Sequence, residues 1–328
     1  MPLVTNRENV LGVYEAAAKK GWVIPTFCSE NLTSTEAVLT AVKDHSERIG
    51  RSNMPITLAI TNLYPHRSQS ANYTHTRRWD IGMKLFLADI RALTEPGSPF
   101  EAIDVMIHLD HIQPDLDKEL LGWDMAQFSS IMFDASGLPF DENIALTSQF
   151  VEKHGSEIVI EGACDETESC ELTTPENAAR YVAETGADFI VANLGTEHRA
   201  SAAELKYHGE LARRIKERIG AKIVLHGCSS VSNDQIGGLF EDGVCKVNIW
   251  TALERDSSPS LLAEMVKHSG KVAGSGVASR LLAEGYLGEK SKSAEKADLG
   301  YYTTLYRQGI VFEEMRRIVG EYLELWYR

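Results

Sequence analysis

The sequence predicts an α/β fold in which eight parallel strands and their helices close into a (β/α)8, or TIM, barrel. Apolar runs rich in β-branched residues occur eight times, and each ends in polar or small residues. Near-continuous apolar runs are typical of parallel strands buried on both faces. Helix-like stretches separate several of them, and this alternation favours a barrel. The eight runs span residues 23–29, 55–61, 104–111, 129–136, 157–165, 188–198, 222–230 and 245–251.

Helical patterns complete the prediction. Residues 1–22 are typical of a capped amphipathic helix, which we expect to cap the barrel. The stretch 34–49 begins with Ser34 as a plausible N-cap. Residues 310–327 repeat apolar positions on one face and predict a C-terminal helical extension, and residues 65–80 predict a long polar loop. A doubly wound sheet is the alternative, but the chain has no G-x-G-x-x-G after an early strand and no P-loop.

Composition limits the partners and the compartment. The chain has 328 residues, a normal size for one barrel, so we expect a single domain over residues 1–328. A formal charge of −14 argues against nucleic acid or an anionic membrane as a partner, and no apolar run approaches the length of a membrane span. Five scattered cysteines without a C-x-x-C motif favour a reducing compartment, the cytoplasm.

Polar residues collect at the ends of the expected strands, and in a barrel these ends face one pocket. Ten histidines occur in the chain, and four of them lie at such ends, together with Asp110, Asn248 and Thr251. Three imidazoles with an open fourth position are the arrangement of a catalytic zinc. The histidines at these ends are His108, His111, His198 and His226. We favour His111 as a ligand, His108 as an orienting neighbour and Asp110 as a proton-transfer group.

Several ordered motifs make the chain resemble a known family over most of its length. They are "HLDH" at 108–111, "SSIMFDASGLPFDENIALT" at 129–147, "LTTPENAARYVAETGADFIVANLGTEH" at 172–198, "VLHGCSS" at 224–230 and "KVNIWTAL" at 246–253. With these motifs the chain resembles the class II, zinc-dependent fructose-bisphosphate and tagatose-bisphosphate aldolases. The resemblance implies reversible aldol cleavage of the C3–C4 bond of a ketose or ketose phosphate into a dihydroxyacetone-type product and an aldehyde.

The resemblance also implies the site residues. One Zn²⁺ per subunit would be held by His111, His198 and His226, with Asp110 as the acid/base; a monovalent cation is a further expectation. The substrate, a sugar or sugar phosphate, would be contacted by a larger set. That set is Asn31, Thr61, Arg199, Ser229, Asn248, Trp250, Thr251 and, from the "LYRQG" segment of a neighbouring subunit, Arg307. The last residue implies a homodimer or homotetramer.

The chain departs from the family pattern at the subsite for the C1 phosphate. Arg199 stands where a glycine is expected, Trp250 where an aspartate is expected, and Cys228 and Ser230 where two glycines are expected. An expected lysine after His198 is also missing. Two alternatives follow. Either larger side chains fill the subsite and the C1 end carries no phosphate, or Arg199 binds an anion directly. Arg77 and Arg78 are further anion-binding candidates or simply a solvated basic turn.

A second departure follows the fifth strand. The family pattern E-x-E-L-G keeps its first glutamate as Glu161, but Ala163 replaces the second and the loop is shorter. The acid/base for the substrate carbon then remains open among Asp165, Glu166, Glu168 and Glu171. The alternatives to an aldolase are a C4-epimerase that cleaves and rejoins the same bond without release, and a non-catalytic sugar-binding relative.

Overall fold

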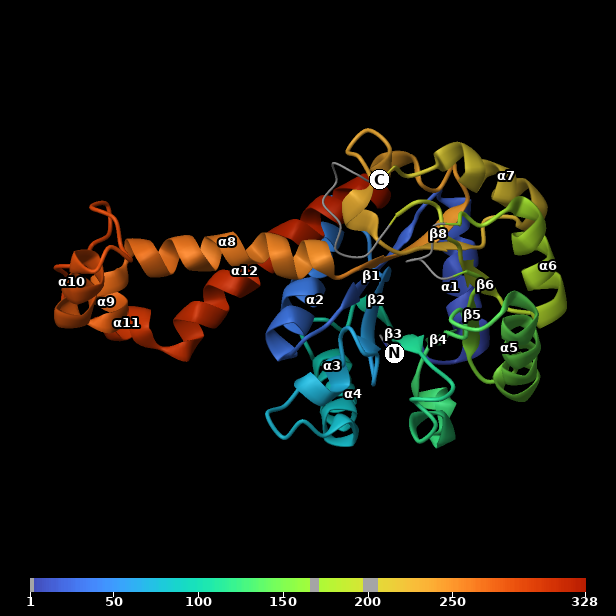
Figure 1. Cartoon of the computed structure of the whole chain (residues 1–328), viewed down its shortest axis with the longest axis horizontal. Coiled ribbons are helices and arrows are strands. Elements are labelled where there is room, and N and C mark those ends of the chain that lie inside the picture. Colours follow the sequence, from blue (N-terminus) through green and yellow to red (C-terminus); the bar gives the residue numbers. More distant parts are fainter. Residues whose placement is uncertain (1–2, 166–170, 197–205) are drawn as a thin grey trace.

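Eight parallel strands close into a barrel in chain order in the computed structural model, which describes residues 3–165, 171–196 and 206–328 (Figure 1). Each strand pairs with its sequence neighbours, and the first pairs with the last. The (β/α)8 prediction is confirmed. The strands are β1 Ile24–Cys28, β2 Met54–Thr61, β3 Ile103–Ile112, β4 Ser130–Phe133, β5 Val159–Ala163, β6 Phe189–Val191, β7 Ile223–Leu225 and β8 Val244–Ile249.

Helices surround the barrel and extend from it. Those of the barrel are α1 Arg7–Lys19, α2 Leu32–Ile49, α3 Gln69–Asn72, α4 Trp79–Thr94, α5 Phe140–His154, α6 Pro175–Thr185 and α7 Gly209–Ile219. The later ones are α8 Thr251–Lys267, α9 Ser269–Ala273, α10 Ser275–Ala283, α11 Leu299–Tyr302 and α12 Thr304–Trp326. Single 3-10 turns occupy Leu120–Gly122, Met125–Gln127, Cys228–Ser230 and Ile236–Gly238. Among the described residues, no helix has the length and apolarity that crossing a bilayer requires.

Two local expectations were wrong. Helix α2 begins at Leu32, two residues before the expected cap Ser34, and has Asn31 as its N-cap. The Asn31 side chain accepts a hydrogen bond from the Ser34 backbone N–H, and the Ser34 hydroxyl accepts one from the Asn31 backbone N–H, which is a capping box. The polar loop after β2 is also shorter than expected, because residues 69–72 form α3 and α4 begins at Trp79.

Helix α1 packs at the end of the barrel where the strands begin. The Arg7 guanidinium donates two hydrogen bonds of 2.6 Å to Asp188, which precedes β6, and a third to the Ile158 carbonyl, which precedes β5. Tyr14 is buried and its ring centroid lies 4.6 Å from that of Phe189. The expected capping helix is therefore present, and the opposite end of the barrel remains available for a site.

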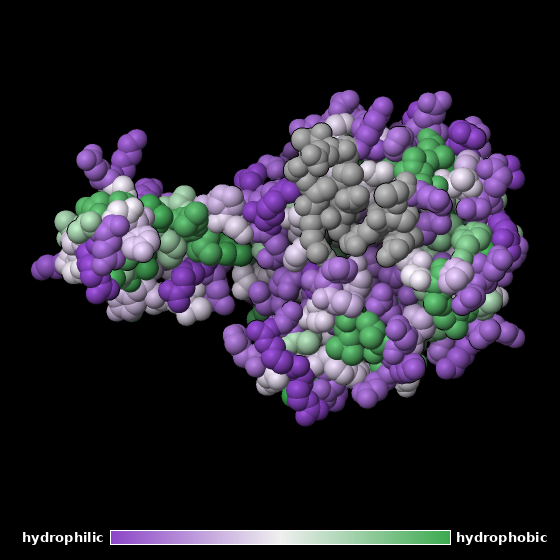
Figure 2. Space-filling view, viewed as in Figure 1, coloured by the Kyte–Doolittle hydropathy of each residue, from purple (hydrophilic) through white to green (hydrophobic). Residues whose placement is uncertain are grey.

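The C-terminal extension forms an arm that projects from the barrel (Figure 1). Helix α8 runs outward, α9, α10 and α11 form the tip, and α12 returns to pack on α2 and α8. The buried face of α12 ends with Trp326, whose indole N–H donates to the Ile236 carbonyl. Apolar side chains lie exposed along the arm (Figure 2), among them Leu262, Tyr286, Leu299 and Leu305.

A charged layer lies inside the barrel, one pleat below the strand ends. The Lys246 ammonium of β8 donates a 2.7 Å hydrogen bond to Glu161 of β5, and both side chains are fully buried. His108 of β3 places its Nε2 3.6 Å from the other Glu161 oxygen and hydrogen-bonds Ser130 of β4 through Nδ1. Desolvating two charges is costly, so such a pair depends on good geometry. The layer therefore ties four strands together beneath the site.

Removing one member of this pair should destabilise the protein strongly. We expect Lys246→Met to lower the free energy of unfolding by about 3–5 kcal/mol at pH 8, because Glu161 is left charged and buried. Burial raises the pKa of Glu161 and Lys246 opposes that shift. The pKa of Glu161 in the variant is then higher still, whereas the unfolded chain keeps a carboxyl pKa of about 4.3.

The folded variant takes up a proton in this interval and the unfolded chain does not, so the stability loss should shrink as the pH falls toward 5. Urea unfolding at the two pH values measures the effect. The double variant Lys246→Met with Glu161→Met should recover most of the loss, since no charge remains buried. Wild-type stability in Lys246→Met alone would contradict this account.

Candidate metal centre and active site

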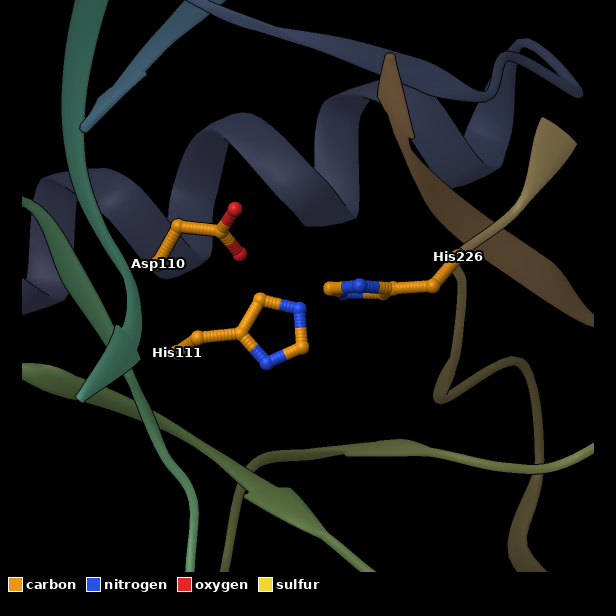
Figure 3. A group of neighbouring side chains, drawn as sticks. All are labelled: Asp110, His111 and His226. Carbon is orange, nitrogen blue, oxygen red and sulfur yellow. The ribbon is translucent and has the colours of Figure 1, made fainter. Parts of the chain in front are cut away.

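The end of β3 is irregular, and this irregularity builds the site. Neighbouring residues of a strand normally face opposite sides of the sheet. His111, however, has a φ of 50°, in the left-handed region that non-glycine residues seldom adopt. The register of β3 against β4 shifts between Leu109 and Ile112. The adjacent side chains of Asp110 and His111 consequently turn toward the same cluster (Figure 3).

The cluster contains Asp110, His111 and His226, all buried (Figure 3). One ligand atom from each lies within 4.8 Å of the others. His226 directly follows β7, and Gly227 after it has a φ of 68°, which turns the chain away from the cluster. Two imidazoles are ligands that suit Zn²⁺, and an ionised carboxylate beside them suits its positive charge, so the residues present fit that metal. The third expected ligand, His198, lies outside the described residues.

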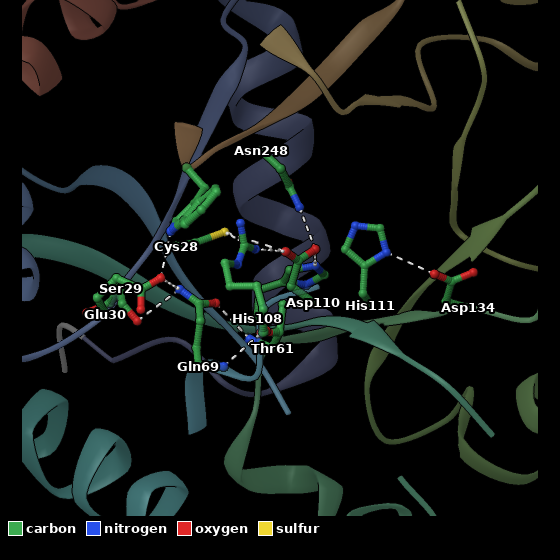
Figure 4. A network of polar contacts seen from close by, with 12 residues as sticks. Cys28, Ser29, Glu30, Thr61, Gln69, His108, Asp110, His111, Asp134 and Asn248 are labelled. Carbon is green, nitrogen blue, oxygen red and sulfur yellow. Dashed lines mark hydrogen bonds and ion pairs between the residues drawn. The ribbon is translucent and has the colours of Figure 1, made fainter. Parts of the chain in front are cut away.

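The ring of His111 is held from two sides. Its Nδ1 donates a 2.9 Å hydrogen bond to Asp134 at the end of β4 (Figure 4). The ring of Tyr64 stacks on it, with the ring centroids 4.4 Å apart. Burial lowers the pKa of His111, but the charges of Asp110 and Asp134 outweigh that effect and raise it. Metal-binding histidines commonly donate their second nitrogen to a carboxylate in this way. The hydrogen bond fixes the ring so that a metal would be bound through Nε2.

Asp110 accepts hydrogen bonds from several directions. The Asn248 amide donates to Oδ1 at 2.9 Å, and the Arg67 guanidinium donates to Oδ2 at 3.1 Å. The Cys28 thiol lies 3.5 Å from Oδ2 (Figure 4). Burial alone raises the pKa of Asp110, but His111, His226 and Arg67 together bring it well below its usual range. Asp110 is therefore ionised and can accept a proton.

His108 is near Asp110 but outside the cluster. Its Nε2 lies 3.9 Å from Asp110 Oδ1, on the side of the charged interior layer. Burial, reinforced by the charge of Lys246, brings the pKa of His108 well below its usual value, so the ring is neutral. The structure thus places His108 as a neighbour beneath Asp110 and His111 as the member of the metal cluster.

A small hollow opens beside Asp110 and gathers four of the expected substrate residues. These are Ser229, Asn248, Trp250 and Thr251, together with Cys28, Arg67 and Gly227. Two other expected contacts do not line it. Asn31 caps α2, and the Thr61 hydroxyl donates to the Arg67 carbonyl in the loop after β2.

The remaining expected residues lie elsewhere. Arg307 is exposed on the arm, where its guanidinium donates to the Tyr302 carbonyl. Arg199 lies outside the described residues. Arg77 and Arg78 are exposed and bond to Asn72 and Asp80, so the structure does not bring them to the hollow.

Sequence reasoning missed three residues that shape the site. Asp134 follows β4 at the same barrel end as the histidines, so the strand-end rule was sufficient to include it. Tyr64 and Arg67 lie in the irregular loop after β2, and no periodic signal in the sequence marks either of them.

A second hollow, of about 110 Å³, lies on the other side of His111. Tyr64, His66, Asp134 and Asp165 are among its lining residues. Asp165 is one of the four carboxylates considered for proton transfer at carbon, and its Oδ2 accepts a 2.6 Å hydrogen bond from Thr173. Glu171 is exposed, and Glu166 and Glu168 lie outside the described residues.

A barrel that gathers buried histidines and an ionised carboxylate at its strand ends is typical of a metal-dependent enzyme. Comparison with known proteins supplies the particular class. The family model for class II fructose-bisphosphate aldolase matches residues 8–299. The chain therefore belongs to the class II fructose-bisphosphate aldolase family and is an aldolase-type lyase.

Relatives and solved structures agree. The chain is 27% identical over 259 residues to the D-tagatose-1,6-bisphosphate aldolase subunit GatY of Klebsiella oxytoca, covering 75% of this chain and 81% of the relative. Fructose-bisphosphate aldolase from Campylobacter jejuni superposes with a TM-score of 0.75 at 17% identity, covering 99% of this chain and 95% of that one. The YdjI aldolase from Escherichia coli K12 gives 0.64 at 19% identity, covering 95% and 94%. These two structural likenesses support the fold.

The hydrogen bond from His111 to Asp134 should support metal binding. We expect Asp134→Asn to weaken Zn²⁺ affinity by about 10- to 100-fold, because the amide carries no charge to orient and polarise the ring. Competition with a chromophoric chelator measures the affinity. Asp115→Asn, a change of the same kind at an exposed position, should bind Zn²⁺ as the wild type does. Equal affinities in the two variants would show that Asp134 does not support a ligand.

Proposed function

We propose that the protein is a zinc-dependent lyase that reversibly cleaves the C3–C4 bond of a ketose or ketose monophosphate, rather than the usual bisphosphate. The products are a dihydroxyacetone-type ketone and an aldehyde. The observation that carries the proposal is the buried group of His111, His226 and ionised Asp110, in which Asp110 also lines the hollow beside it. Membership of the class II aldolase family supports the reaction type.

His111 and His226 would hold the metal, with His198 as the proposed third ligand. A bound zinc supplies a Lewis acid for the substrate's C2 carbonyl and for the charge that develops there. Asp110 takes the proton of the C4 hydroxyl. The C4–O electrons then form the aldehyde, the C3–C4 bond breaks, and its electron pair passes to C3 and the C2 carbonyl as an enediolate. Asn248 holds Asp110 in place through its amide.

A proton must afterwards reach C3 of the ketone product. Of the four carboxylates considered for this step, Asp165 lines the hollow on the other side of His111, and we assign the proton transfer to it. The Thr173 hydroxyl, which donates to Asp165, fixes the orientation of its carboxylate. Ala163, at the position of the second family glutamate, has no group that can exchange a proton.

The arm is the part of the chain that we expect to mediate assembly of subunits. Arg307 lies near the start of α12 at the tip of the arm, is exposed, and is not among the residues that line the hollow. We infer a homodimer or homotetramer in which the arm carries Arg307 to a neighbouring site, where it binds a distal phosphate or hydroxyl. Exposed apolar side chains on the arm, such as Leu299 and Leu305, support an interface there. Sedimentation of Leu305→Asp against wild type tests this assembly, and an unchanged oligomer would exclude it.

Asp110 should be essential for turnover but not for the metal. We expect Asp110→Asn to lower the cleavage rate by about 10²–10⁴-fold, because the amide cannot accept the C4 proton. Zinc content should stay near one per subunit, measured by atomic emission, and removing zinc from the wild type with a chelator should abolish turnover reversibly.

Asp115→Asn serves as the matched control and should retain full activity. The assay follows triose release from a panel of ketoses and ketose monophosphates. Recovery of a C4 epimer without free triose would replace the lyase by an epimerase. Failure of every ketose in the panel, with zinc bound, would refute the proposed reaction.

A further inference from the structure

Arg67 lines the hollow beside Asp110 and has no role in the proposed bond cleavage. Its guanidinium donates to Asp110 at 3.1 Å and lies 3.4 Å from the Cys28 sulfur. Only 12% of the side chain is exposed. Its Nε is buried and has no hydrogen-bond partner among the described residues. A buried donor without a partner costs about 1–3 kcal/mol in general, so this nitrogen is suited to a ligand.

The position of this guanidinium is fixed by its surroundings. Its central carbon lies 4.5 Å from the ring centroid of Trp250, a stacking arrangement that favours arginine. The Trp250 indole N–H donates a 2.6 Å hydrogen bond to Glu30, which also accepts one of 2.8 Å from Gln69. The Thr61 hydroxyl donates to the Arg67 backbone carbonyl. Arg67 and Trp250 thus form one wall, held in place by residues outside the hollow.

Two more buried polar atoms without partners among the described residues belong to the same hollow. They are the Ser229 hydroxyl and Asn248 Oδ1. The amide of Asn248 is oriented by its donation to Asp110, so Oδ1 is left as an acceptor. Arg67 Nε offers a donor, and Ser229 can donate or accept. A ligand that satisfies all three must itself both donate and accept. A hydroxyl group does so, whereas the oxygens of a phosphate dianion only accept.

The charges around Arg67 also favour an uncharged ligand. Arg67 is the single cation of the hollow as described, and its charge already interacts with the carboxylates of Asp110 and Glu254, the second of which also interacts with Glu30. Burial and the charge of Glu30 raise the pKa of Glu254 to about 7, and Arg67 opposes that shift. A phosphate dianion placed against Arg67 would also meet these acids. The hollow has about 20 Å³ of room for water, roughly what one ordered water needs.

We propose that Arg67, Ser229 and Asn248 form a subsite for the uncharged hydroxymethyl group next to the reacting carbonyl. The ketone product is then dihydroxyacetone and not its phosphate, and any phosphate of the substrate is at the distal end. Arg67 is the specificity-determining residue, since its donor meets the C1 oxygen while its charge stays matched by Asp110. This inference rests on the proposed aldolase function.

Binding of two enediolate mimics tests the subsite directly. Glycolohydroxamate carries a hydroxymethyl end, and phosphoglycolohydroxamate carries the phosphorylated one. Calorimetry on the zinc-loaded full chain should give an affinity at least about tenfold higher for glycolohydroxamate, a difference of one good hydrogen bond. Arg67→Met should weaken glycolohydroxamate binding by about 10- to 100-fold and leave zinc content unchanged.

Controls separate recognition from folding. Arg67→Lys keeps the positive charge beside Asp110 but lacks the Nε donor, so it should fold, bind zinc and still lose most of the glycolohydroxamate affinity. Arg91→Met removes the same kind of side chain from an exposed position on α4 and should bind like the wild type. Circular dichroism confirms that each variant is folded.

Two results would overturn the inference. One is tighter binding of phosphoglycolohydroxamate by the wild type, and the other is wild-type glycolohydroxamate affinity in both Arg67 variants. Either result is compatible with aldolase activity. The first would mean that the ketone product is phosphorylated, and the second that a residue other than Arg67 recognises the hydroxymethyl group. Failure of the proposed function looks different. In that case neither dihydroxyacetone nor its phosphate exchanges its carbon-bound hydrogens with D₂O in the presence of the zinc-loaded protein.

Discussion

The site depends on a single backbone conformation at the end of β3. A regular strand would send Asp110 and His111 to opposite faces, and the left-handed conformation of His111 brings both to one cluster. Such a conformation costs of order 1–3 kcal/mol and persists where its surroundings hold it. Here Asp134 accepts a hydrogen bond from the His111 ring and Tyr64 stacks on it. Asn248 and Arg67 donate hydrogen bonds to Asp110. The end of β4, the loop after β2 and strand β8 therefore supply the restraints that keep the acid/base and the metal ligand together.

Physical periodicity explains which parts could be predicted from the sequence. The buried parallel strands have a nearly continuous apolar signal, and barrel geometry brings their ends together, so the sequence alone predicts that Asp110, His111 and His226 lie at one site. Local polar side chains gave no such signal. We expected Asn31 to contact the substrate, but its side chain caps helix α2. A short polar side chain suits either role, so its identity alone does not distinguish them. Arg67 lies in a loop without periodicity, and only the folded chain shows that it reaches Asp110.

Charge is balanced locally although the chain carries a formal charge of −14. Inside the barrel Glu161 is matched by Lys246, and at the mouth Asp110 is matched by Arg67. Each of these two cations is thus paired with a neighbouring carboxylate. Selection of a sugar then depends on the pattern of donors and acceptors and on space more than on a general attraction for anions. Such a site selects the end of the sugar that satisfies its buried donors and acceptors, because a different end group would leave some of them without hydrogen bonds.

The arm and the hollow are parts of one continuous segment. Trp250, a wall of the hollow, is the N-cap of α8, and Thr251 is the first residue of that helix and also lines the hollow. Helix α8 has 17 residues, so it spans about 25 Å between the hollow and the tip of the arm. A helix of that length behaves as a stiff rod, with Pro259 as its one point of interruption. Whatever immobilises the tip therefore also steadies the indole ring at its other end.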